Sequence, residues 1–154
     1  MVPIAIREDA VIMVVDDSEN DITIIVRAIQ RAKMRNRIVS VSDGEEAMAY
    51  LEGKGRYADR REHPLPDLVL VDLKMPKVDG FELLAWIRGQ PALKRLAVVV
   101  LTSSELLLDV SKAYELGANS FLVKPTEFED LEAMVRTLGS VLSKAADQGP
   151  GVPE

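Results

Sequence analysis

Short apolar runs alternate regularly with segments whose apolar residues recur every three or four positions. The runs are rich in Val, Ile and Leu, and they lie near residues 11–15, 38–42, 67–72, 97–102 and 119–123. Strands separated by helices form crossover units that place the strands parallel. The runs at 69–71 and 97–101 are continuous, as expected for strands that helices cover on both faces. The pattern predicts an α/β fold with a doubly wound, five-stranded parallel sheet.

The segments between the runs predict five amphipathic helices. Their apolar faces are Ile22, Ile25, Val26, Ile29 and Met34; Ala47, Met48 and Leu51; Phe81, Leu84, Ala85 and Ile87; Leu107, Val110, Ala113 and Tyr114; and Phe128, Leu131, Val135 and Leu138. Ser18, followed by Asp21, is a candidate N-cap for the first helix. Asp43-Gly44 and Asp79-Gly80 predict turns that open the second and third helices, and Gly117 is placed to end the fourth.

The chain of 154 residues is long enough for one domain with a substantial core, which we expect over residues 1–145. Residues 53–66 interrupt the alternation with Gly, Pro and mixed charges, and they predict an enlarged loop before the third strand. The final segment, 146–154, is rich in polar residues, Gly and Pro, and we expect it to be disordered.

The composition is ordinary for a globular protein, with 47% hydrophobic and 29% charged residues. The chain contains no cysteine, no run near the roughly 20 apolar residues that span a bilayer, and no signal-peptide pattern at its start. We therefore expect a cytoplasmic protein that does not insert in membranes. The net charge of −6 argues against nucleic acid as a direct partner.

One stretch departs from the acidic balance. Arg27, Arg31, Lys33, Arg35 and Arg37 follow one another without an intervening acid. Cations near a helix C-terminus complement the helix dipole, so a solvated helix end is the favoured interpretation. A docking patch for a partner is the alternative.

Polar residues end four of the predicted strands. Asp16-Asp17 and Asp72 follow the first and third runs, and Thr102 and Lys124 end the fourth and fifth. In an open α/β sheet these strand ends share the edge at which ligands bind. Two carboxylates about 4 Å apart repel by roughly 4 kcal/mol at an effective dielectric constant of 20, so a cation or a proton must offset the cluster. Oxygen ligands favour Mg²⁺, and Mg²⁺ beside an Asp nucleophile suits phosphoryl transfer.

The ordered motifs are similar to those of a known family. Asp16-Asp17, Asp72, Met75-Pro76, Asp79-Gly80, Thr102-Ser103 and Lys124-Pro125 together resemble the receiver domain of two-component response regulators. The resemblance covers about residues 10–143 and implies a flavodoxin-like fold with strand order 2-1-3-4-5. The enlarged loop and the missing output segment look most like stand-alone receivers paired with phytochrome-type or other hybrid sensor histidine kinases.

The resemblance also implies roles for individual residues. Asp72 would accept a phosphoryl group from a histidine kinase. Side chains of Asp17 and Asp72 and the backbone carbonyl of Lys74 would bind Mg²⁺, and Asp16 would bind it mostly through water. Lys74 stands where smaller polar residues are frequent in the family, and Ser104 lies where family members differ in how water reaches the acyl phosphate. Both positions bear on the lifetime of the phosphorylated state.

Three further residues have implied roles. Thr102 and Lys124 would contact the phosphoryl group, Phe121 would swing inward as Thr102 moves, and the Lys124–Pro125 bond would be cis. Taken singly, each has a plainer interpretation: Thr102 as a strand former, Lys124 as a solvated cation and Phe121 as a core residue.

Three functions compete at this point. The first is a switch without enzymatic output, whose phosphorylation changes the surface of helix 4, strand 5 and helix 5 over about residues 105–143. Helical periodicity cannot bury all of Leu106, Leu107 and Leu108, so we expect a homodimer or partner contact there. The second is a Mg²⁺-dependent phosphatase that forms an aspartyl phosphate, but the general acid of such enzymes would fall at Lys74. The third is a module that binds without phosphorylation, which the complete acidic set disfavours.

Overall fold

The computed structural model describes residues 10–148, and it describes side chains as far as residue 138. Strands and helices alternate in the order β1 (Val11–Val15), α1 (Glu19–Arg31), β2 (Arg37–Val41), α2 (Gly44–Glu52), η1 (Gly55–Tyr57), β3 (Leu68–Val71), α3 (Gly80–Gly89), η2 (Pro91–Leu93), β4 (Ala97–Thr102), α4 (Leu107–Glu115), β5 (Ser120–Val123) and α5 (Phe128–Gln148). The five strands lie where the apolar runs predicted them. None of the described helices is both long and apolar enough to cross a bilayer.

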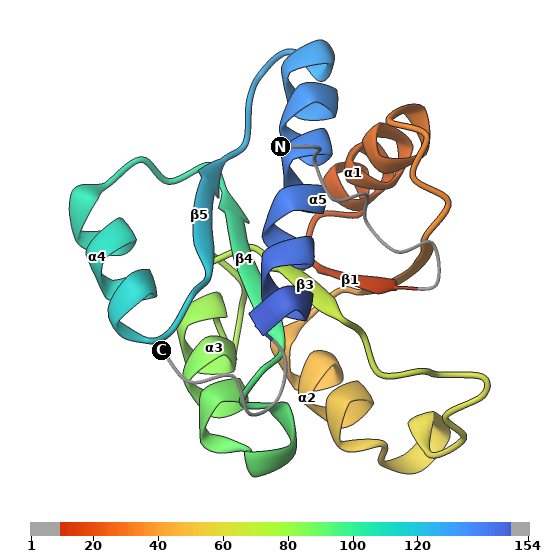
Figure 1. The fold of residues 1–154 in the computed structure, drawn as a ribbon. Helices are drawn as coiled ribbons and strands as arrows, with labels where there is room; N and C mark the ends of the chain where they lie inside the picture. Colours follow the sequence, from red (N-terminus) through yellow and green to blue (C-terminus); the bar gives the residue numbers. More distant parts are fainter. Residues whose placement is uncertain (1–9, 149–154) are drawn as a thin grey trace.

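The strands form one parallel sheet in the order β2-β1-β3-β4-β5 (Figure 1). Both the parallel sheet and the order 2-1-3-4-5 are therefore confirmed. Every residue of β3 and β4 is buried, as the continuous runs at 69–71 and 97–101 predicted, and every residue of β1 is buried as well. Because all the strands run the same way, their carboxyl ends meet at one edge of the sheet.

Helices cover both faces of the sheet. Ile25 and Ile29 of α1 pack with Leu131 and Val135 of α5 in one core cluster. The cluster on the other face contains residues of α2, α3 and α4, among them Tyr50, Leu84 and Ala113. Figure 1 shows this arrangement, with α5 beside α1 and with α2 and α3 together. The side chains of each strand therefore enter two separate cores in alternation.

Two of the predicted helix faces needed correction. In α3, Leu83 is buried and Ala85 is exposed, because the helix begins at Gly80 and this sets which residues face the sheet. In α4, Ala113 is buried, but Leu107 is 82% exposed and Tyr114 is 49% exposed. This helix packs on the protein through one narrow side and leaves its first turn in solvent.

The predicted helix starts are confirmed. The Ser18 hydroxyl accepts the backbone N–H of Asp21, and the Asp43 carboxylate accepts that of Glu46. Asp79 and Glu82 form a reciprocal capping box at the start of α3. Gly117 follows α4 with φ of 104°, in the left-handed region that favours glycine.

The segment 53–66 is a well-defined loop that contains the short helix η1. The Arg60 guanidinium donates to the backbone carbonyls of Tyr50, Leu51 and His63, and the Tyr50 hydroxyl donates to the carbonyl of Pro64. These bonds tie the loop to the end of α2. At the other end of the chain, α5 includes residues 146–148 of the predicted tail, whereas residues 149–154 lie outside the described residues.

Arg88 joins three segments at the amino-terminal edge of the sheet. Its guanidinium donates to the carbonyl of Gly117 at 2.8 and 3.0 Å, to those of Lys94 and Leu96 at 3.0 and 2.6 Å, and to the Asn119 side chain at 2.9 Å. One side chain thus holds the end of α3, the start of β4 and the α4–β5 turn together.

Replacing Arg88 with alanine is therefore expected to destabilise the fold. Several carbonyls would lose a charged donor at once, and we expect the free energy of unfolding to fall by about 2–3 kcal/mol in urea denaturation. Arg61, an exposed loop residue, offers the control: Arg61→Ala should change the same quantity by less than about 0.5 kcal/mol. Equal values for the two variants would contradict the bridging role of Arg88.

Candidate functional site

Three aspartates meet at the carboxyl edge of the central strands. Asp16 and Asp17 follow β1, Asp72 follows β3, and one oxygen from each lies within 4.8 Å of the other two. Asp16 is 1% exposed and Asp72 is 8% exposed, whereas Asp17 faces solvent. The sequence predicted this convergence because strand ends share one edge of an α/β sheet. In the structure it occurs because β1 and β3 are neighbours in the sheet.

The ammonium of Lys124 lies among these carboxylates. Its Nζ is 2.7 Å from Asp16, 2.8 Å from Asp21 and 3.3 Å from Asp72. Burial lowers the pKa of Lys124, but its bonds to Asp16 and Asp21 and the charge of Asp72 outweigh burial and raise this pKa overall. Lys124 is therefore a fixed positive charge that offsets part of the acidic cluster.

Asp21 is the one member of this ion-pair network that the sequence interpretation missed. The sequence suggested a role for Asp21 in helix capping only, and its backbone N–H does bond to Ser18. Its carboxylate, however, accepts from Lys124. The available signal was its place in the first turn of α1, because that helix starts at the edge where β1 ends.

The cluster has the properties that a divalent cation requires. Burial raises the pKa of Asp16 above its ordinary value of 3.8, although hydrogen bonds from Lys124 and from the backbone N–H of Ser18 oppose the shift. Oδ1 of Asp72 is buried and accepts no hydrogen bond from the described residues. An oxygen in this state has capacity for a ligand, and the donor set consists of the hard oxygens that bind Mg²⁺ or Mn²⁺.

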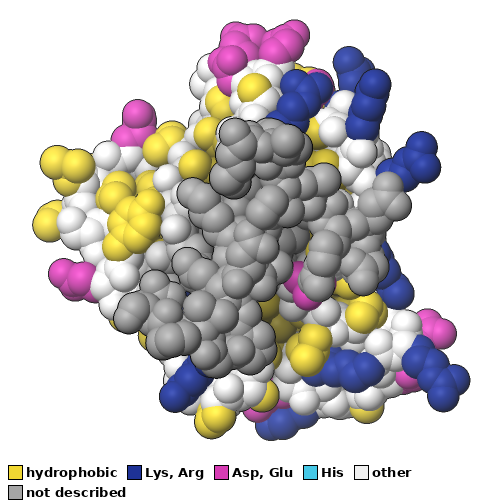
Figure 2. Space-filling model, viewed as in Figure 1, with side chains coloured by type: hydrophobic (Ala, Val, Ile, Leu, Met, Phe, Trp, Pro, Cys, Tyr) yellow, Lys and Arg dark blue, Asp and Glu magenta, His cyan; other side chains and the backbone are white. Residues whose placement is uncertain are grey.

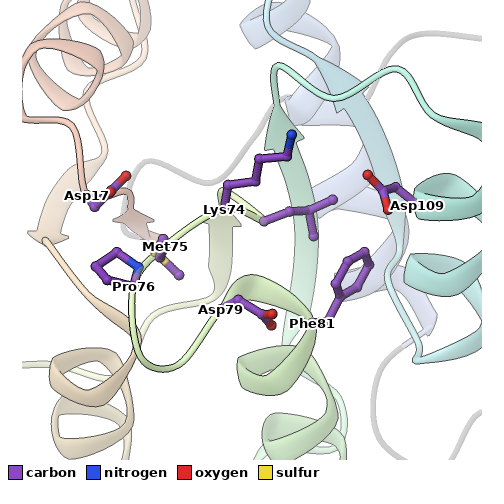
Figure 3. Close-up of a pocket in the computed structure, with 8 residues that line it drawn as sticks. Asp17, Lys74, Met75, Pro76, Asp79, Phe81 and Asp109 are labelled. Atoms are coloured by element: carbon purple, nitrogen blue, oxygen red, sulfur yellow. The ribbon is translucent and has the colours of Figure 1, made fainter.

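A cavity of about 440 Å³ opens beside the cluster. Its lining residues are Asp17, Leu73, Lys74, Met75, Pro76, Asp79, Phe81 and Asp109. Figure 3 shows Asp17 on one side of this space, the loop with Lys74 and Pro76 next to it, and Phe81 and Asp109 on the other side. A small charged ligand that reaches Asp72 would therefore approach between the β3–α3 loop and the start of α4.

Gly80 permits the close packing that positions Asp72. A Cβ atom at Gly80 would lie 2.3 Å from the Asp72 carbonyl oxygen and 2.8 Å from the Leu73 Cα. The backbone N–H of Gly80 donates to the Leu73 carbonyl at 2.9 Å. The start of α3 thus rests directly on the backbone of the site, and any side chain at position 80 would displace it.

Thr102 connects the site to α4. It is fully buried at the end of β4, and its Oγ1 accepts the backbone N–H of Ser104 at 3.4 Å. The Ser104 hydroxyl in turn donates to Asp109, and it accepts the backbone N–H of Leu106 at 3.4 Å. These contacts form a continuous path from the strand end to the first turn of α4.

The remaining predicted residues lie around this path. Lys74 is exposed on the rim of the cavity. Phe121 is half-buried against the core cluster of α2, α3 and α4, and its backbone N–H donates to the Tyr114 hydroxyl at 3.1 Å. The prediction of a cis Lys124–Pro125 bond is wrong: every peptide bond in the described chain is trans. Trans is the intrinsically favoured form even before proline.

The chain is similar to proteins of one family. Residues 12–136 match the response regulator receiver domain. Response regulator Rcp1 of Synechocystis sp. is 39% identical over 130 residues, which cover 84% of this chain and 86% of Rcp1. The probable methanogenesis regulatory protein FilR2 of Methanothrix harundinacea is 40% identical over 131 residues, which cover 83% of this chain and 80% of FilR2.

Solved structures show the same similarity. The phosphorylated cyanobacterial phytochrome response regulator RcpA has a TM-score of 0.77 and 38% identity, covering 84% of this chain and 91% of RcpA. The Mn²⁺-bound form of Rcp1 has a TM-score of 0.75 and 39% identity, covering 85% of this chain and 92% of Rcp1.

Divalent-cation binding should depend on the aspartate cluster. We expect Asp17→Asn to weaken Mg²⁺ binding by about tenfold or more in isothermal titration calorimetry, because a charged oxygen ligand is lost. Asp109→Asn is the matched control, since Asp109 lines the same cavity outside the cluster. It should change the affinity by less than about threefold, as expected for a screened charge. Equal losses would show a general field effect rather than ligation.

Proposed function

Because the chain belongs to the response regulator receiver family, we propose that it is a phosphorylation switch whose phosphoacceptor is Asp72. The observation that carries this proposal is the pairing of a buried Asp72, with one oxygen free of hydrogen bonds from described residues, and an ammonium 3.3 Å from the other oxygen. A nucleophile and a cation for the transferred group therefore stand side by side.

In the proposed reaction a carboxylate oxygen of Asp72 attacks the phosphorus of a phosphohistidine on a sensor kinase. The new P–O bond forms as the P–N bond breaks, and the bond electrons leave with the imidazole. Lys124 and Thr102 would contact the transferred phosphoryl oxygens. Mg²⁺, when bound, neutralises negative charge on the phosphoryl group and its acceptor. Side chains of Asp17 and Asp72 and the backbone carbonyl of Lys74 would hold it, and Asp16 would hold it mostly through water.

The kinase is proposed to dock on the groove next to Lys124. This groove of about 200 Å³ is lined by Ile24 and Ile25 of α1 and by Pro125, Phe128 and Leu131 on the other side. A donor histidine must come within bonding distance of Asp72, so its helix has to lie close to this apolar surface. The similarity to RcpA, which is a phytochrome response regulator, supports a phytochrome-type kinase as the partner of this chain. We expect the exchange to occur in the cytoplasm.

The signal is proposed to reach α4, β5 and α5. A phosphoryl group that attracts the Thr102 hydroxyl would disturb its contact with Ser104, and Ser104 holds both Asp109 and the N–H of Leu106. Phe121, half-buried in β5, would occupy space that Thr102 leaves. The result is a changed surface at the start of α4 and not a product released by turnover.

Two copies of the chain are proposed to associate through that surface and form a homodimer. Leu106, Leu107 and Leu108 are 62%, 82% and 83% exposed, and Figure 2 shows hydrophobic side chains gathered over α4 on the left. Adjacent exposed leucines are unusual on a monomer surface. The same patch on a second copy would cover them in a two-fold contact.

Phosphorylation gives the first test. Incubation with acetyl phosphate and Mg²⁺ should add one phosphoryl group, seen by intact mass, and Asp72→Asn should abolish the addition because an amide is a poor nucleophile. Asp59→Asn, at an exposed aspartate of the enlarged loop, should be labelled like the parent protein.

Two outcomes of this experiment would contradict the proposal. Labelling that persists in Asp72→Asn would place the acceptor elsewhere. Sustained hydrolysis of p-nitrophenyl phosphate would favour the alternative of a Mg²⁺-dependent phosphatase. The exposed Lys74 at the position of the general acid argues against that alternative.

The dimer has a separate test. We expect the phosphorylated protein to elute as a dimer in size-exclusion chromatography and Leu107→Glu/Leu108→Glu to elute as a monomer. Loss of two leucines that the dimer contact would bury should reduce the free energy of dimerisation by about 3 kcal/mol or more, which corresponds to at least a 100-fold weaker dimer. Leu65→Glu changes a leucine of the enlarged loop that is 45% exposed, and it should still dimerise. A parent protein that stays monomeric in both phosphorylation states would rule the dimer out.

A further inference from the structure

A basic surface covers the end of α1 and the start of β2. It consists of five exposed cations, Arg27, Arg31, Lys33, Arg35 and Arg37, and residues 22–42 contain no acid. Figure 2 shows Lys and Arg side chains gathered on the right, over α1 and the turn that follows it in Figure 1. The rest of the chain carries 14 cations against 25 acids, a net charge of −11. The basic surface is thus an isolated region of opposite sign.

Most of these cations have no acidic partner among the side chains described, which are those of residues 10–138. Arg37 donates to the backbone carbonyl of Glu62 at 2.6 Å, and the other four side chains form no ion pair with a described residue. Lys33 has a φ of 62°, in the region that favours glycine, so the turn holds this lysine despite backbone strain. The surface therefore offers positive charge that the described acidic side chains leave unpaired.

A hollow of about 1090 Å³ lies beside these cations. Val26, Met34 and Ile38 contribute apolar lining, and Lys33 and Arg35 add positive charge. A solvated helix end does not require such a hollow, because cations that complement a helix dipole need only water around them. Apolar lining next to unpaired cations is the mixture found at binding surfaces.

This surface is separate from the site at Asp72. The α1 helix begins beside Asp16 and ends at Arg31, and its 13 residues span roughly 20 Å at about 1.5 Å per residue. The basic surface therefore lies toward the opposite edge of the sheet. A partner bound there could be engaged together with a kinase at the phosphorylation site, since the two surfaces do not overlap.

We propose that the basic surface binds an acidic protein segment that carries apolar side chains between its acidic ones. Acidic side chains would pair with the arginines, and apolar side chains would enter the hollow lined by Val26, Met34 and Ile38. Charge complementarity selects the partner, because the surrounding charge of −11 repels any acidic segment that lacks this local contact.

An extended polyanion fits this surface less well. Nucleic acid and anionic membranes present negative charge over areas much wider than five cations, and the remaining acidic surface would repel them. A nucleic acid would contact the surface with its phosphate backbone and a membrane with its lipid headgroups, and neither group is apolar enough to fill the hollow. A short segment of mixed acidic and apolar residues matches both properties of the site.

The test uses the full chain and a short fluorescein-labelled peptide in which pairs of glutamates alternate with single leucines. We expect saturable binding in fluorescence anisotropy that weakens as salt is added. Arg31→Glu/Arg35→Glu should weaken binding by at least about tenfold. Arg61→Glu/Lys94→Glu makes the same change of net charge at exposed positions elsewhere and should weaken it by less than about threefold. Asp72→Asn should bind the peptide like the parent protein. A failure of the basic-surface proposal can therefore be distinguished from a failure of the proposed phosphorylation switch.

Several results would overturn the proposal. These are no binding of the peptide, equal loss in the two double variants, or equal binding of a peptide with glutamine in place of glutamate. Tighter binding of single-stranded DNA or of phosphatidylserine vesicles would reassign the surface to a polyanion. Circular dichroism and thermal melting of each variant separate a binding defect from misfolding.

Discussion

The acidic residues at the carboxyl edge impose the constraint on which the rest of the site depends. The fold brings one carboxylate oxygen each of Asp16, Asp17 and Asp72 within 4.8 Å of one another, and it places the Asp21 carboxylate beside the ammonium of Lys124. Carboxylates at this spacing repel by about 3–4 kcal/mol per pair at an effective dielectric constant near 20. Lys124 offsets part of that repulsion, and the start of α1 adds the positive end of its helix dipole. Four carboxylates lie near one ammonium, so the compensation is incomplete and the site favours a further cation.

The surrounding backbone holds the carboxylates together against their repulsion. Asp16 and Asp72 are held through the sheet, since their N–H groups donate to the carbonyls of Val41 and Val15. Gly80 lets α3 press on the Asp72 backbone, so the carboxylate cannot retreat from its neighbours. The repulsion is thus retained in the folded state, and the hydrophobic core on both faces of the sheet stabilises the protein against it.

The features that could be predicted from the sequence follow from periodicity and topology. Parallel strands end at one edge, so Asp72 and Lys124 had to lie near each other once the strands were recognised. Side-chain direction on short helices was harder to predict. Leu107 belongs to an apolar pattern but lies in the first turn of α4, outside the core, and the ion pair of Asp21 depends on where α1 starts. These details depend on how each helix packs on the sheet, which a repeat of three or four residues does not specify.

The position of Lys124 bears on why the proposed switch would require a metal. In the structure its ammonium is shared among Asp16, Asp21 and Asp72. If Asp72 is phosphorylated as proposed, nearly two negative charges are added to the site. The Lys124 ammonium would then have to interact with the phosphoryl oxygens, and the negative charge of Asp16 would be less well neutralised. One ammonium cannot balance both. A divalent cation on the aspartates would free Lys124 for the phosphoryl group, so cation binding and phosphorylation should favour each other. The resting ion-pair network and the need for a metal are then consequences of the same excess of negative charge.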